Sequence, residues 1–164
     1  MKTAFLTVFL AALPLVAQEH SVVASLAKHL KLSKEYTIAI AQQMPADSYG
    51  FKPNAEEMSF GEQMSHIANA NAMFGGILNN TKGKDYNKTD KDSVIAALND
   101  SFDGAIAVVS GLKESELFQI KKTPEGDWTI LDSALLMLDH TTHHRAQCVV
   151  YLRVKGIKPA EYRF

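Results

Sequence analysis

The sequence predicts an all-α protein, a four-helix bundle formed by one domain. Four long segments carry apolar side chains at the three- and four-residue spacing of a helix, and no segment shows convincing strand alternation. The 164 residues, 46% hydrophobic and 21% charged, are enough for one core and not two. We find no internal repeat and no low-complexity tract.

The first seventeen residues differ in composition from the rest. Lys2 is their only charge, and an apolar run follows that ends in the small residue Ala17 before Gln18. This pattern is typical of a secretory signal peptide, and the run is shorter than the ~20 residues that span a bilayer. We therefore expect a leader at 1–17, a single mature domain at 18–164 without a membrane span, and a periplasmic or secreted location.

The first two helices are expected on either side of an ordered loop. The first helix is predicted at about 21–44, and residues 45–58 contain the prolines and glycine of a loop. Ser59 and Glu62 have the spacing of a capping box, which predicts that the second helix starts there. A polar segment, 79–90, follows as a surface loop.

The other two helices are expected in the second half of the chain. The third is predicted at about 92–110, and the connection after it carries Phe118 and Ile120, which we expect to pack against the bundle. Thr129 is predicted to cap the fourth helix, which continues to about Lys155. Its apolar residues cover more than one stripe, which is typical of a central helix or of an oligomer interface.

Three histidines form the candidate metal site. His140 and His144 are four residues apart, which places them one above the other on the same helix face. His66 lies in the middle of an apolar helix, where a buried imidazole needs a partner, and a bundle can bring it to the other two. Three neutral imidazoles leave coordination positions open. Thr141 follows His140 where a zincin would have its glutamate, which disfavours a metalloprotease.

Two stretches resemble a known family. Residues 59–68 (SFGEQMSHIA) resemble the second-helix signature of the DinB-like family, and 139–147 (DHTTHHRAQ) with 151–157 (YLRVKGI) resemble its fourth-helix signature. The resemblance implies an up-down-down-up bundle, a metal site on the three histidines and, commonly, a homodimer. The family includes thiol S-transferases and a mycothiol-dependent isomerase. Ala146 departs from its frequent glycine, and alanine is the better helix former.

Four neighbours of the three histidines have less specific roles. Gln147 is a weak catalytic candidate that could hydrogen-bond a metal-bound water or simply pack between helices. Glu62, the other weak candidate, could act as a base, although its capping role already explains it. His143 is expected beside the ligands or on the surface. Cys148 is expected as an inert core residue, with the role of a fourth ligand as the alternative.

The function expected from these residues is metal-dependent hydrolysis outside the cytoplasm, with a divalent ion, zinc or nickel, and a small-molecule substrate. Without residues 1–17 the chain has 16 basic and 18 acidic residues, since Lys2 alone is lost, so no basic surface for nucleic acid is indicated. One alternative is a non-catalytic metal or small-ligand binding protein. Another is a thiol S-transferase, which requires a cytoplasmic chain because such thiols are kept inside the cell.

Overall fold

The computed structural model describes residues 21–123 and 126–162, so the expected leader at 1–17 lies outside the described residues. Four long helices are joined by loops and by one small hairpin. In chain order the elements are α1 (Val22–Gln43), a 3-10 turn (Ala46–Ser48), α2 (Phe60–Asn79), α3 (Lys91–Ser110), a 3-10 turn (Glu114–Glu116), β1 (Ile120–Thr123), β2 (Gly126–Thr129) and α4 (Ile130–Val154).

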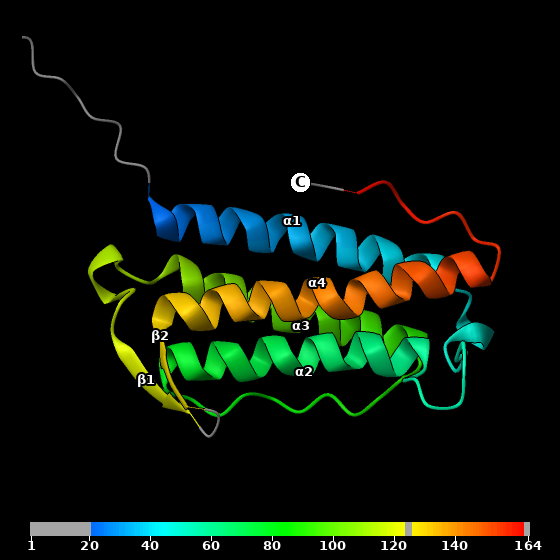
Figure 1. Cartoon of the computed structure of the whole chain (residues 1–164), viewed down its shortest axis with the longest axis horizontal. Coiled ribbons are helices and arrows are strands. Elements are labelled where there is room, and N and C mark those ends of the chain that lie inside the picture. Colours follow the sequence, from blue (N-terminus) through cyan, green and yellow to red (C-terminus); the bar gives the residue numbers. More distant parts are fainter. Residues whose placement is uncertain (1–20, 124–125, 163–164) are drawn as a thin grey trace, which may run out of the picture.

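The helices form one bundle with up-down-down-up topology, which confirms the predicted fold class. In Figure 1, α1 and α4 run in one direction, and α2 and α3 run in the other. Each of α1 and α2 packs against both α3 and α4, so α1 and α2 lie diagonally opposite each other. The two long parallel neighbours, α2 and α3, require a connection that returns along the length of the bundle.

Capping boxes start α2 and α4 where the sequence predicts them. The Ser59 hydroxyl accepts a hydrogen bond from the Glu62 amide at 3.2 Å, and the Glu62 carboxylate accepts from the Ser59 amide at 2.6 Å. Thr129 and Asp132 make the same exchange at the start of α4. Each box satisfies two backbone donors that the first helical turn leaves without partners.

Helix α3 begins at Lys91, slightly earlier than predicted, because the Asp90 side chain accepts from the amide three residues on. By length and composition alone, it is the one helix among the described residues that could cross a membrane. Its most apolar positions, Val94, Leu98 and Phe102, are fully buried between α1 and α2. Packing in the bundle core thus accounts for part of the apolar composition of α3.

The core consists of two apolar clusters and a polar layer. One cluster, around Met44, Phe60 and Leu152, fills the end of the bundle where α4 terminates. The other cluster, around Phe74 and Met137, fills the end near the hairpin. Near the boundary of the two clusters lie six buried polar residues, which we call the polar layer: Ser33, Thr37, Asn71, Ser101, Thr141 and Arg145. Buried polar groups need hydrogen-bond partners, so this layer is where specific chemistry is expected.

A two-stranded antiparallel hairpin, β1 and β2, precedes α4, and the sequence-based expectation for this segment was wrong. The strands have four residues each, too few to show a clear alternation. Strand pairing fixes which side chains face the helices: Trp128 stacks on Phe74, with ring centroids 6.2 Å apart. Phe118 and Ile120, expected against the bundle, are instead 74% and 65% exposed.

Residues 80–90, which we call the crossover, return from the end of α2 to the start of α3 and lie along α2 (Figure 1). Glycines permit this close approach. A Cβ on Gly83 would lie 2.6 Å from the Ala72 carbonyl oxygen, and a Cβ on Gly61 would collide with the Thr89 carbonyl oxygen. The crossover is therefore held against α2, where it forms part of the wall around the candidate site.

Candidate metal centre

Helices α2 and α4 bring the three predicted histidines together. One ring nitrogen from each of His66, His140 and His144 lies within 4.8 Å of the others. The ring centroids are 4.9 Å apart for His66 and His140, and 4.5 Å apart for the other two pairs. Metal–nitrogen bonds are about 2.0–2.1 Å, so small side-chain movements allow all three nitrogens to reach one ion. The triad can therefore bind a metal ion, while its role as the ligand set stays a prediction.

The electrostatics of the triad fit a cation. The Nε2 atom of His140 is buried and has no hydrogen-bond partner among the described residues. Burial, followed by the neighbouring His66 and His143, lowers the pKa of His140. Burial, followed by His140, lowers the pKa of His144 from 6.5 to about 4. At neutral pH both rings are therefore neutral, with lone pairs available, and a buried lone pair without a donor is satisfied by a metal.

A chain of side-chain amides orients one of the three rings. His144 donates from Nδ1 to the Gln63 side-chain oxygen at 2.5 Å, which leaves Nε2 as the ligand atom. The Gln63 amide nitrogen donates to the Gln147 oxygen, and the Gln147 nitrogen donates to His143 Nε2 at 2.9 Å. We call Gln63 and Gln147 the amide chain. It connects the half-buried ring of His144 to the exposed ring of His143 across α2 and α4.

Sequence reasoning assigned no role to Gln63, although it is 2% exposed and holds the ring of His144. The available signal was its position one helical turn before His66 on the inward side of α2. A glutamine at such a position is equally typical of ordinary interhelix packing, so the pattern alone does not single it out.

The part of the chain that contains the three histidines matches a known family. A family model described as DinB superfamily matches residues 29–148. The chain belongs to the DinB superfamily. Among the solved structures that share the fold of this DinB protein are three that are 15–19% identical to it in sequence. At such identities the likeness shows the fold alone. No curated protein matches the sequence.

Each of the three structures aligns with most of this chain. The DinB-like protein YjoA of Bacillus subtilis is 19% identical, with a TM-score of 0.70 over 85% of this chain and 97% of that one. A DinB-like protein from Bacillus cereus is 15% identical, with a TM-score of 0.75 over 84% and 95%. A conserved protein from Enterococcus faecalis is 15% identical, with a TM-score of 0.63 over 83% and 98%.

The structure separates the neighbours of the triad by role. Gln147 bridges α2 and α4 through the amide chain, which corresponds to the packing interpretation. The carboxylate of Glu62 is engaged in the capping box and lies 3.5 Å from Lys52. Hydrogen bonds from Ser59 lower the pKa of Glu62, so this carboxylate is ionised at neutral pH.

Cys148 lies outside the triad, as a residue of the apolar cluster at the far end of α4. Its side chain is fully buried, and burial raises the pKa of the thiol. A thiol in such surroundings is neither a reactive nucleophile nor a thiolate ligand. In this DinB protein the candidate site therefore comprises the three imidazoles and the amide chain that contacts them.

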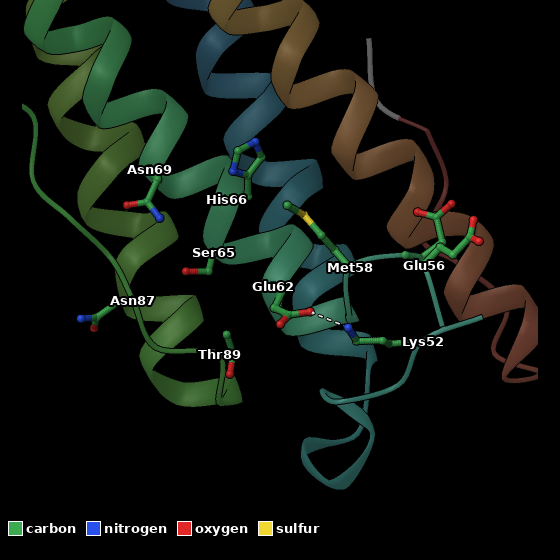
Figure 2. A pocket seen from close by; sticks show the side chains of 10 residues that line it. Lys52, Glu56, Met58, Glu62, Ser65, His66, Asn69, Asn87 and Thr89 are labelled. Carbon is green, nitrogen blue, oxygen red and sulfur yellow. Dashed lines mark ion pairs between the residues drawn. The ribbon is translucent and has the colours of Figure 1, made fainter. Parts of the chain in front are cut away.

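A pocket of about 400 Å³ opens beside His66. Figure 2 shows that its side chains come from α2, from the loop before it and from the crossover. All of them except Met58 are polar: Lys52, Glu56, Glu57, Glu62, Ser65, His66, Asn69, Asn87 and Thr89. The pocket is thus large enough for a small polar molecule next to one of the three imidazoles.

Proposed function

We propose that this protein binds one divalent metal ion, zinc or nickel, on His66, His140 and His144, and hydrolyses a small polar substrate with it. The observation that carries the proposal is the buried Nε2 of His140, which lacks any partner among the described residues while two further imidazole nitrogens lie within 4.8 Å. A divalent metal would satisfy that atom and complete the site.

The donor set supports zinc or nickel, because neutral imidazole suits these ions and no carboxylate belongs to the group of three. When bound on three ligands with open positions, such an ion supplies Lewis acidity and a nucleophilic water near neutral pH. The protein contributes orientation: Gln63 fixes the tautomer of His144, and the pocket beside His66 holds the substrate with its amide and hydroxyl groups.

We place this hydrolase outside the cytoplasm, on the basis of the leader-like residues 1–17. Export also ranks a hydrolase above a thiol S-transferase, since the thiol cosubstrates are kept inside cells. The intact mass of the protein purified from its host should correspond to a chain that starts at or near Gln18. Full-length protein recovered from the cytoplasm would overturn the location and restore the transferase alternative.

A non-catalytic metal or ligand binding protein is the second candidate, and one observation favours it. The carboxylate nearest to His66 in sequence, Glu62, has its pKa lowered by hydrogen bonds from Ser59, which makes it a weaker base for a substrate proton. A binding protein requires no such base, whereas a hydrolase has to take its base from the metal site or from the substrate.

The deciding experiment combines elemental analysis with a panel of hydrolase and transferase substrates. We expect about one equivalent of zinc or nickel in protein from its native compartment, hydrolysis of at least one substrate, and loss of both in His144→Ala. Metal without turnover across the panel would support the binding protein. Absence of metal from the native protein, together with no uptake of added zinc or nickel, would overturn the metal site itself.

A further inference from the structure

Arg145 directly follows His144 on α4 but faces α1 instead of α2. The side chain is only 6% exposed. Its Nη1 atom donates to the Ser33 hydroxyl at 2.7 Å and to the Thr37 hydroxyl at 3.3 Å, and its Nη2 atom donates to Thr142 at 3.2 Å. The guanidinium carbon also lies 5.0 Å from the centre of the Tyr36 ring. The group is thus held in place at the α1 side of the polar layer.

The charge of Arg145 has no anionic partner in the described part of the chain. None of the ion pairs between described residues involves Arg145, and its hydrogen-bond acceptors are neutral oxygens. An arginine keeps its charge in proteins, and a buried charge is costly without a counter-ion. The hydrogen bonds leave Nε and one of the two Nη2 hydrogens without an acceptor among these residues. Nε and Nη2 together form one edge of a guanidinium, and such an edge can bind a carboxylate with two parallel hydrogen bonds.

A pocket of about 290 Å³ lies at this guanidinium, between α1 and α4. His29, Ser33 and Thr142 supply polar groups, Leu32 and Leu138 supply an apolar wall, and Tyr162 of the C-terminal segment closes one edge. None of the described residues that line the pocket is acidic. A cavity with a fixed cation, hydroxyl groups and an apolar wall matches a small organic anion in both charge and shape.

We propose that this pocket is a second ligand site, separate from the metal centre, that binds a small monocarboxylate with a compact apolar body. The carboxylate accepts two hydrogen bonds from Nε and Nη2 of Arg145, and the apolar body packs against Leu32 and Leu138. The ligand thereby supplies the counter-ion that the buried guanidinium lacks among the described residues. The site does not depend on the function of the metal centre, because its contacts come from α1 and the opposite side of α4.

The test uses benzoate as the probe and benzamide as its neutral counterpart of the same shape. Binding to the full-length protein is measured by calorimetry, with and without saturating zinc, and located by backbone amide chemical shifts. We expect benzoate to bind at least about tenfold more tightly than benzamide, since the bidentate contact requires the charge. The affinity should be the same with and without zinc, and the shifts should cluster around Ser33, Leu138 and Thr142.

Variants test whether binding requires the bidentate hydrogen bonds of Arg145 or only a positive charge. Arg145→Lys keeps the charge but loses the bidentate geometry, and should weaken benzoate binding by about tenfold. Arg153→Lys, an exposed position on the same helix, is the matched control and should leave binding unchanged. If Arg145→Lys does not fold, Thr142→Val, which removes the acceptor of Nη2 at nearly constant volume, should still weaken binding severalfold. Equal binding of benzoate and benzamide, no binding at all, or benzoate shifts confined to the histidine triad would each overturn the proposal.

Discussion

The two sides of the polar layer carry opposite chemistry, although consecutive residues of one helix supply them. His144 faces α2 and meets the imidazoles of His66 and His140, and the buried Nε2 of His140 has no hydrogen-bond partner among the described residues. Arg145 faces α1 and presents hydrogen-bond donors to neutral oxygens. One side offers imidazole lone pairs that suit a cation, while the other offers a fixed positive charge without an anionic partner among the described residues. The comparison shows that a central helix can serve two clefts independently, because adjacent residues point about 100° apart.

Deleting a ligand of the triad should give the largest effect. His144→Ala leaves two imidazoles on different helices, and it should lose most of the metal stabilisation, roughly 3 kcal/mol at a hundredfold excess of metal over its dissociation constant. His143→Ala should keep most of it, because the exposed His143 makes an edge contact with the His144 ring but does not belong to the group of three ligand atoms. Melting temperatures with and without zinc or nickel measure both. Equal metal-induced shifts in the two variants would show that the ligands are misassigned.

Removing the support of His144 should have the next largest effect. Gln63→Leu deletes the acceptor of the His144 Nδ1–H, and such changes typically lower metal affinity about 10- to 100-fold. Gln63→Glu keeps an acceptor and should retain the affinity. Gln42→Leu, an exposed glutamine of α1, is the matched control. An unchanged zinc dissociation constant in Gln63→Leu would mean that the amide chain only packs α2 against α4.

Acid should destabilise the triad side of the layer in metal-free protein. The folded-state pKa of His144 is lowered from 6.5 to about 4, so the unfolded chain binds more protons between these values. Stability is then fully present above about pH 6.5 and is lost as the pH falls towards 4. Discounted for partial exposure of the ring, the effect is roughly 1–2 kcal/mol.

Chemical denaturation of chelator-treated protein across this pH range provides the measurement. His144→Gln should flatten the profile, and saturating zinc should move the loss of stability to lower pH. A profile identical in the wild type and in His144→Gln would locate the acid sensitivity elsewhere.

The smallest effect is expected for the loss of one hydrogen bond to Arg145, and it concerns the free energy of unfolding. Ser33→Ala removes one acceptor of Arg145 Nη1 and should lower the free energy of unfolding by about 1 kcal/mol. Ser25→Ala, at an exposed position of the same helix, should be nearly neutral. The metal-induced shift in melting temperature should be unchanged in Ser33→Ala. A reduced shift would show that the two sides of the layer are coupled.

The parts of the fold that depend on local sequence were predictable. Ser59 and Thr129 mark helix starts because capping satisfies backbone donors within one turn, so the signal lies in four consecutive residues. His140 and His144 share a face for the same local reason, the pitch of the helix. The meeting of His66 with that face followed from the expectation of a bundle, which brings separate helices together.

Features that depend on pairing between distant segments were not predictable. The hairpin strands are too short to show a period, and the exposure of Ile120 is decided by its partner strand and by Trp128. The role of Gln63 requires its contact with His144, which lies 81 residues away in sequence. The setting of Arg145 likewise depends on hydroxyl groups of α1, more than a hundred residues distant.

The parallel arrangement of α2 and α3 has a consequence for how the pocket beside His66 can vary. The crossover supplies Asn87 and Thr89 to the pocket but none of the three imidazoles. One part of the pocket wall therefore belongs to a stretch of chain that holds no member of the triad. Substitutions within the crossover can change what the pocket accepts without disturbing the triad, provided that Gly61 and Gly83 are kept, since these two glycines let the crossover lie against α2.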